Sequence, residues 1–141
     1  MTDRRSFLTM SLAGAAASWL AAREAAAAPS SRVVVQRDMP PVSLDGWQVT
    51  VSEVSYPPGE SSARHQHPGF VCGYVLEGQY RFGVEGQAAT VLSAGQPFFE
   101  MPGDVHAVSG NASITQPARI LAMVFTPKSQ PVTKPGDGAA A

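Results

Sequence analysis

The sequence predicts an all-β protein with a single domain, and three observations support this prediction. Apolar residues alternate with polar ones in segments such as Trp47, Val49 and Val51, which is typical of β-strands. Turn-forming residues recur at short intervals, with 13 Gly and 12 Pro in the chain. No helical periodicity follows residue 46, and 141 residues leave room for one such domain. Short strands at this spacing favour a sandwich, a jelly roll or a barrel.

The expected strands are separated by turns that contain Gly or Pro, at 56–59, 77–78, 85–86 and 102–103. In chain order they are 47–51, 74–76, 80–82, 88–92, 98–99 and 120–125. The turns at 77–78 and 85–86 are interpreted as β-hairpins. Before them, residues 29–45 are expected to form an N-terminal edge strand and a loop. Residues 46–126 then form the β-domain, and residues 127–141 are expected to be a flexible tail.

The first 28 residues resemble a twin-arginine export signal. Arg4 and Arg5 precede a short apolar run at 11–22, and small residues at 25–28 suit cleavage near Ala27 or Ala28. The run is too short to span a bilayer well, so no stable membrane anchor is expected. An uncleaved amphipathic helix is the alternative. The resemblance implies export of a folded protein, and therefore a periplasmic or secreted location.

Composition and charge restrict the partners of this chain. The formal net charge is −1 and the sequence has no basic patch or stripe, so nucleic acid is not expected as a partner. Cys72 is the one cysteine, which excludes an intramolecular disulfide. The expectation of a small-molecule ligand or substrate comes from the family resemblance described below.

The chain has three histidines, and their spacing predicts a metal site. His65 and His67 are two residues apart, so in a strand their side chains share a face with Cα atoms about 6–7 Å apart. Two imidazoles at that spacing can converge on one ion at about 2.0–2.1 Å. His106 has to reach the same point from a distant strand.

Two sequence clusters carry these histidines and resemble the paired signatures of the cupin superfamily. The first reads Gly59-x5-His65-Gln66-His67 and ends at Gly78, and the second runs from Gly95 through Pro102-Gly103 to His106 and Asn111. The resemblance covers about residues 46–126. It implies a single cupin jelly-roll β-barrel that holds one divalent transition metal, such as Fe, Mn, Zn, Ni or Cu.

One departure from those signatures affects the expected ligand set. The family's glutamate ligand falls at Val71 when counted back from Gly78, and valine cannot bind a metal. Counting forward from His67 lands on Cys72 instead, but the spacing to Gly78 is then one residue short. The Val71 register is favoured, and in that register Cys72 faces away from the histidines.

Glu100 is the candidate replacement for the missing glutamate. It shares parity with Phe98 on the strand that leads into the second cluster, so it points inward if Phe98 does. A buried carboxylate needs a partner, either the metal or a ligating histidine. The alternative is a carboxylate at the solvent-exposed rim. The expected metal ligands are therefore His65, His67, His106 and Glu100.

Three functional hypotheses follow. The first is a metalloenzyme of the cupin type that acts on a small molecule, with oxygenase, isomerase and lyase chemistry unassigned. The second is a non-catalytic barrel that binds or senses a metal or small ligand. The third is a metal-free scaffold whose histidines only form hydrogen bonds in the core. The resemblance and the exposed strand edges are consistent with a homodimer.

Overall fold

The computed structural model describes residues 29–136, and all of its regular elements there are β-strands. The predicted export signal at 1–28 lies outside the described residues. The strands are β1 (Trp47–Tyr56), β2 (His65–Gln66), β3 (Phe70–Glu77), β4 (Gln79–Val84), β5 (Thr90–Ser93), β6 (Pro97–Glu100), β7 (Val105–Asn111), β8 (Ala118–Pro127) and β9 (Lys134–Pro135). They belong to one compact unit that begins at Arg32. Within residues 29–136 there is no helix with the length and apolar character that crossing a bilayer requires.

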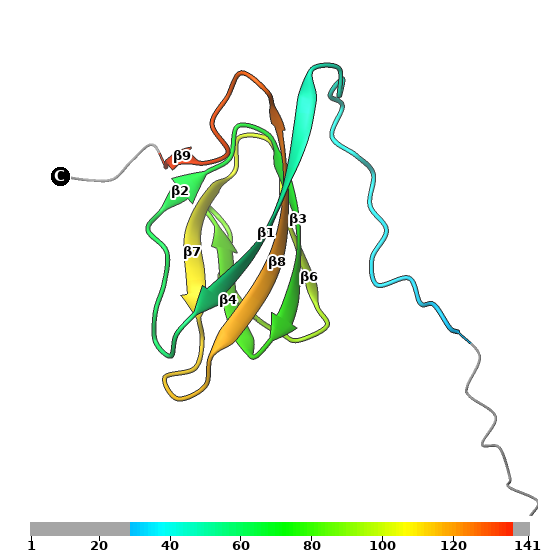
Figure 1. The fold of residues 1–141 in the computed structure, drawn as a ribbon. Coiled ribbons are helices and arrows are strands. Elements are labelled where there is room, and N and C mark those ends of the chain that lie inside the picture. Colours follow the sequence, from blue (N-terminus) through cyan, green and yellow to red (C-terminus); the bar gives the residue numbers. More distant parts are fainter. Residues whose placement is uncertain (1–28, 137–141) are drawn as a thin grey trace, which may run out of the picture. The chain divides into compact units, whose positions relative to one another are not determined.

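The strands form two antiparallel sheets that face each other (Figure 1). One sheet has the order β1-β8-β3-β6, and the other has the order β5-β4-β7-β2-β9. Strands that are neighbours in a sheet are thus far apart in the chain, as when β1 pairs along its whole length with β8. This arrangement confirms the predicted all-β jelly roll.

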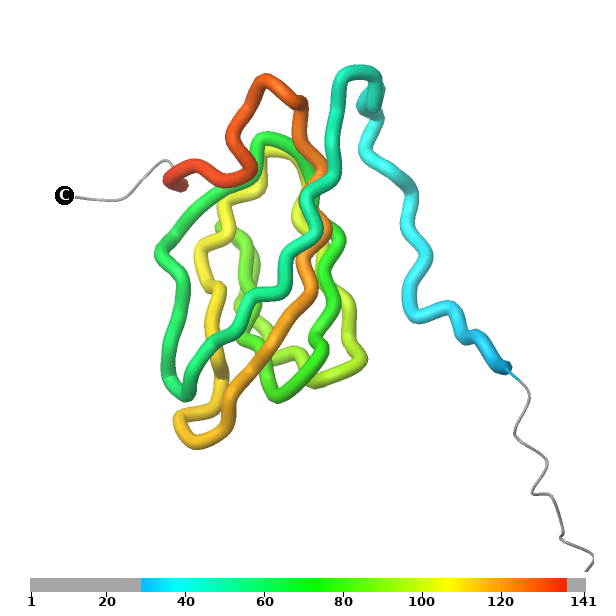
Figure 2. The backbone as a smooth tube through the Cα atoms, in the orientation of Figure 1, coloured from blue at the N-terminus to red at the C-terminus, as the bar shows by residue number. Residues whose placement is uncertain are grey.

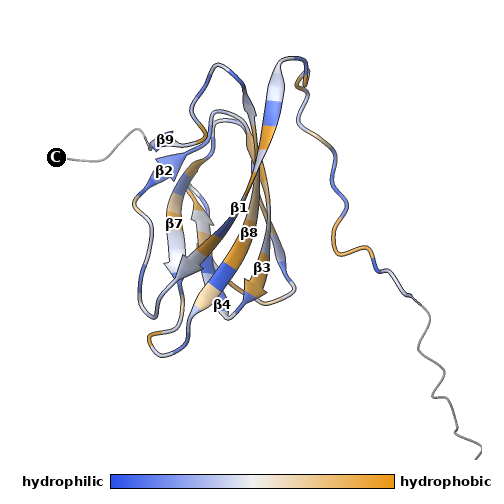
Figure 3. Cartoon of the chain, in the orientation of Figure 1, coloured by the Kyte–Doolittle hydropathy of each residue, from blue (hydrophilic) through white to orange (hydrophobic). Residues whose placement is uncertain are grey.

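The core lies between the two sheets. Its buried side chains come mainly from β3, β6 and β8, and Figure 3 shows apolar colouring along β3 and β8. The members of this cluster are Tyr56, Val71, Val75, Tyr80, Phe98, Ala118, Ile120 and Val124. One feature of β1 differs from the expectation, because Val49 and Val51 are 51% and 58% exposed. The opposite, more polar face of β1 turns inward, with Ser52 and Val54 on the wall of a cavity.

The two predicted hairpins have different outcomes. The turn at 85–86 joins strands β4 and β5, which do pair with each other, so this hairpin is confirmed. The turn at 77–78 is not a hairpin, because β3 pairs with β6 and β8 while β4 pairs in the other sheet. It is a corner between sheets. Gly78 suits that corner, since its φ is +72° and an added Cβ would lie 2.2 Å from the Pro117 carbonyl oxygen.

Two flanking segments also differ from their predictions. No strand forms in residues 29–45, where Pro40 and Pro41 cannot donate to a sheet. Residues 127–136, expected as part of a flexible tail, instead turn back over the barrel end. There β9 pairs with β2, which gives this segment backbone hydrogen bonds that its composition did not indicate. Figure 2 shows this return of the chain beside the strand that carries His65.

Candidate functional site

The structure brings the three histidines together at one end of the barrel. His65 on β2 and His106 on β7 are direct cross-strand partners, although 41 residues separate them in the chain. Their ring centroids are 4.9 Å apart, and the centroids of His65 and His67 are 5.1 Å apart. The prediction that the histidines of the two sequence clusters lie close together in the fold is therefore confirmed.

Backbone carbonyls fix the orientation of two of these rings. Nδ1 of His65 lies 2.8 Å from the Ala63 carbonyl oxygen, and Nδ1 of His67 lies 2.7 Å from that of Val132. A carbonyl can only accept, so Nδ1 carries the proton in both rings. Nε2 of each neutral imidazole therefore keeps its lone pair, which is the form that binds metals.

Burial favours the same neutral form of His65. Its pKa is lowered from 6.5 chiefly because removal from water disfavours the imidazolium, and the neighbouring His106 and His67 lower it further. The hydrogen bond to Ala63 and the charge of Glu100 oppose this shift without reversing it. His65 is thus prepared as a neutral ligand near pH 7.

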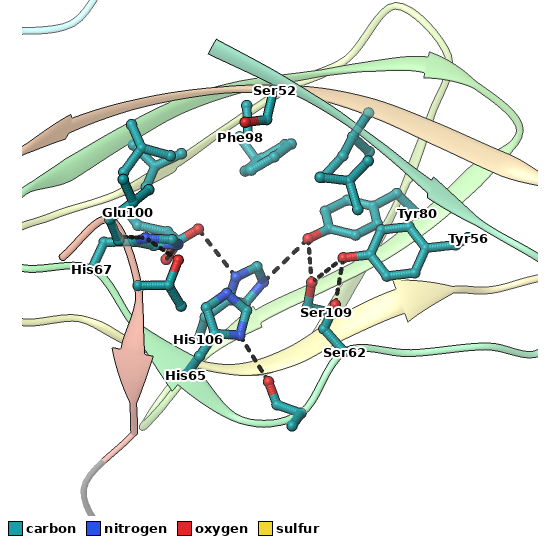
Figure 4. A pocket seen from close by; sticks show the side chains of 18 residues that line it. Ser52, Tyr56, Ser62, His65, His67, Tyr80, Phe98, Glu100, His106 and Ser109 are labelled. Atoms are coloured by element: carbon teal, nitrogen blue, oxygen red, sulfur yellow. Dashed lines mark hydrogen bonds and ion pairs between the residues drawn. The ribbon is translucent and has the colours of Figure 1, made fainter. Parts of the chain in front are cut away.

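Glu100 faces the histidines from β6, as Figure 4 shows, and it is only 3% exposed. Its Oε1 lies 3.1 Å from Nδ1 of His106, and its Oε2 lies 3.9 Å from Nε2 of His67. Oε2 of Glu100 is buried without a hydrogen-bond partner, and the short approach of His106 Nδ1 to Oε1 does not have the geometry of a hydrogen bond. A buried carboxylate is costly when it is not compensated, so this position suits a cation.

The side chains do not stand ready as a complete metal site. Among residues 29–136, no three His, Cys, Asp or Glu side chains are arranged so that they could hold an ion as placed. His106 is one reason, because its Nε2 lies 3.3 Å from the Tyr80 hydroxyl while Nδ1 faces Glu100. As placed, both ring nitrogens of His106 are therefore directed at these two side chains.

Val71 lies in the site but supplies no ligand atom. It is 1% exposed and lines the same cavity as the histidines, directly opposite Glu100 in the pairing of β3 with β6. Cys72 lines a different cavity on the other side of that sheet, which confirms that it faces away from the histidines. The carboxylate is therefore one strand away from the position where the family signature has its own.

The cavity beside the histidines has a volume of about 400 Å³. One wall is apolar and comes mainly from the β1-β8-β3-β6 sheet, with Val54, Val71, Phe98, Ile120, Ala122 and Val124. The polar part of the lining consists of the three histidines, Glu100 and six hydroxyl-bearing residues, Ser52, Tyr56, Ser62, Tyr80, Ser109 and Thr133. A cavity of this size and polarity suits a small molecule with both apolar and polar parts.

The hydroxyl groups form a chain that ends at His106 (Figure 4). The Tyr56 hydroxyl lies 3.0 Å from Ser62 Oγ and 2.8 Å from Ser109 Oγ, and Ser109 Oγ lies 2.8 Å from the Tyr80 hydroxyl. Burial strongly raises the pKa of Tyr80, so this phenol stays protonated. The sequence analysis did not identify these four residues as part of a site, because isolated Ser and Tyr residues carry no spacing signal.

The C-terminal segment is a further part of the site that the sequence did not indicate. Val132 and Thr133 line the cavity, and the Val132 carbonyl accepts the hydrogen bond that orients His67. Thr133 Oγ1 also lies 3.4 Å from the same ring nitrogen. The side-chain pattern of residues 127–136 could not indicate the contact with His67, because a backbone carbonyl makes it and every residue has one.

Comparison with known proteins agrees with this architecture. Residues 52–124, about half of the chain, match the family model described as Cupin domain. No curated protein sequence matches the chain.

Several solved structures are similar in fold. A double-stranded beta-helix protein from Klebsiella pneumoniae is 22% identical with a TM-score of 0.53, over 63% of this chain and 75% of that one. A cupin-like protein from Thermotoga maritima is 23% identical with a TM-score of 0.54, over 61% and 62%. The DMSP lyase DddQ from Ruegeria pomeroyi is 22% identical with a TM-score of 0.55, over 66% of this chain but only 45% of its own. At these sequence identities, the similarity to the three proteins shows a shared fold and nothing further.

Proposed function

Because this chain belongs to the cupin domain family, we propose that it binds one divalent transition metal and presents it to a small molecule in the barrel cavity. His65, His67 and His106 supply imidazole nitrogens, and Glu100 supplies a carboxylate oxygen. One observation carries the proposal. The imidazoles of His65 and His67 are oriented through Nδ1, which leaves Nε2 available, and Glu100 in the same cavity has a buried Oε2 without a hydrogen-bond partner.

The donor set fits such an ion in type and in charge. Imidazole suits Zn, Cu, Fe and Ni, and one carboxylate offsets one of the two positive charges. A dication bound there would supply a Lewis acid or an activated water or dioxygen at its open positions. With the metal bound, Glu100 would also gain the counter-charge that its burial requires.

The cavity walls define how this chain would hold a ligand. The apolar wall excludes water from one side, and the Tyr56–Ser109–Tyr80 hydroxyls on the other side can donate to a polar group of the ligand. Tyr80 also faces His106, so its hydroxyl positions that ring. Small molecules with one apolar part and one oxygen-bearing group therefore suit the cavity best.

A non-catalytic binding or sensing barrel is the second candidate function. The observation that favours it is that the cavity hydroxyls already bond to one another. Such a wall suits retention of a ligand more than proton transfer. Turnover separates the two candidates: an enzyme converts its ligand, whereas a binding module returns the ligand unchanged.

The location proposed for this function is the periplasm, reached through the twin-arginine-like segment at 1–28. Export in the folded state would let the chain take up its metal in the cytoplasm. Replacing Arg4 and Arg5 together by Lys is expected to keep the chain in the cytoplasmic fraction. Unchanged export of that variant would contradict this assignment.

Elemental analysis of the protein purified from its native compartment tests the metal proposal. The wild-type chain is expected to contain about one dication per chain by the ligand count of a single site, and the double variant His65→Ala/His67→Ala to contain almost none. The exposed turn residue Gln87 offers a matched control, Gln87→Ala, which should keep the wild-type metal content. Equal metal in the double variant and the wild type would remove the central claim.

A further inference from the structure

All the sulfur-bearing side chains of residues 29–136 line one cavity. Met39, Cys72, Met101 and Met123 share a space of about 210 Å³, which we call the sulfur pocket. It lies on the β3, β6 and β8 face opposite to the histidines, because Val71 lines the histidine cavity while its neighbour Cys72 lines this one. The gathering draws on four distant parts of the chain, so local sequence does not explain it.

The strand register places three of these side chains next to one another. Cys72 on β3 is the direct cross-strand partner of Met123 on β8 and of Phe99 on β6. Met101 is two residues beyond Phe99, which puts it diagonal to Cys72. Direct partners have Cβ atoms about 4.5–5.5 Å apart, and diagonal ones about 7–8 Å, which is within reach of long side chains.

The fourth sulfur atom reaches the pocket from outside the sheet. Met39 belongs to the segment 37–40, which lies over this face, and the Arg37 guanidinium is 4.9 Å from the centre of the Phe99 ring. That cation–π contact holds the segment in place at an exposed site. Phe70 and Phe125, stacked at 4.6 Å, form an aromatic part of the wall. The other lining residues are Arg37, Asp38, Pro40, Phe99 and Glu100, and Glu100 also lines the histidine cavity.

We propose that the sulfur pocket is a binding site for a soft monovalent cation, copper(I), separate from the histidine site. Thiolate and thioether ligands select copper(I), whereas the oxygen and nitrogen donors of the other cavity suit dications. Thioethers are neutral and supply no counter-charge, so a monovalent ion is less costly to bury among them than a dication. Methionine side chains have three rotatable bonds, so they can close around an ion.

Access and protonation agree with this assignment. Met39 and Met101 are 59% and 37% exposed, which leaves the pocket open to an incoming ion. Burial raises the pKa of the Cys72 thiol, so the thiol is protonated before the ion arrives. The three thioethers have no proton to lose, and they bind first. If Cys72 then joins as a thiolate, its one thiol proton leaves to solvent as the Cys72–copper bond forms.

Competition with a coloured copper(I) chelator, bathocuproine disulfonate, under anaerobic conditions tests the proposal on the full chain. The wild type is expected to withdraw one copper(I) per chain from the chelator by the count of one pocket. The double variant Met101→Leu/Met123→Leu keeps side-chain volume and is expected to bind at least about tenfold more weakly. Equal binding by this variant and the wild type, or no withdrawal by the wild type, would overturn the proposal.

Three further experiments keep the result interpretable. The His65→Ala/His67→Ala variant is expected to retain copper(I), because the substitutions remove the histidine site and leave the sulfur pocket intact. Loss of copper(I) binding in this variant would assign the ion to the histidines and overturn the proposal. Should the leucine double variant unfold, Met39→Leu on the covering segment replaces it, with the same expected weakening. X-ray absorption of the copper(I) form should show sulfur neighbours, and a shell of nitrogen alone would contradict the site.

Discussion

Val71 and Glu100 are direct cross-strand partners, and both side chains line the cavity that holds the histidines. The family signature expects its carboxylate at the first position, and this chain has one at the second. Because opposite residues have Cβ atoms about 4.5–5.5 Å apart, a carboxylate at either position can reach nearly the same point. The missing glutamate is thus compensated across the strand pair, in the metal site that we propose.

An exchange of these two residues tests that compensation. Glu100→Val is expected to weaken metal binding about 10–100-fold, because a supporting carboxylate is lost. The double variant Val71→Glu/Glu100→Val is expected to recover most of the affinity, since the carboxylate returns from the neighbouring strand. Isothermal titration with Zn²⁺ measures both. A double variant that binds no better than Glu100→Val would show that position 71 cannot supply the carboxylate, and unchanged affinity in Glu100→Val would show that Glu100 has no role in binding the metal.

The C-terminal segment is expected to support the same site. Deleting residues 128–141 removes the Val132 carbonyl that orients His67 and the β9 strand that pairs with His65. Metal affinity should fall about 10–100-fold, as it does when the groups behind metal ligands are lost. Deletion of 137–141 alone is the matched control and should leave the affinity unchanged. If the two deletions bind equally well, the segment has no such role.

Stability should decrease as the pH falls, through His65. Its pKa is lowered in the folded chain, so the unfolded chain takes up the proton first, near 6.5. The unfolded state then binds more protons, and the free energy of unfolding falls as the pH drops below that value. Urea unfolding in the presence of a chelator, at about pH 7.5 and about pH 5.5, measures this. His65→Asn should lose less stability between the two; an identical loss in both proteins would contradict the assignment.

Gly73 makes room for the aromatic ring of Phe98. A Cβ added there would lie 2.0 Å from Cζ of Phe98, which is inside the ring's van der Waals surface. Gly73→Ala should lower the free energy of unfolding by about 1–3 kcal/mol, as overpacking does. In the double variant with Phe98→Leu the two losses should be less than additive, because the shorter side chain leaves space. Strict additivity in chemical denaturation would show that the two positions do not interact.

Much of the fold was open to prediction because its signals are local. Alternation along β1, short apolar runs in β3 and β8, and the recurring glycine and proline turns indicated strands, and the all-β jelly roll is confirmed. Local signals did not decide which strands pair. The turn at 77–78 was therefore misinterpreted as a hairpin, and the apolar set Val49 and Val51 faces outward because the inner face of β1 borders a partly polar cavity.

The sequence alone determined which side chains share a face, because strand geometry repeats every two residues; His65 with His67, and Glu100 with Phe98, follow from that. Only the tertiary structure decided which faces meet. The pairing of His65 with His106, of Val71 with Glu100, and of β9 with β2 each depends on backbone hydrogen bonds between residues far apart in the chain. Backbone groups are chemically alike at nearly every residue, so the sequence does not label them, and packing of the whole chain selects their partners.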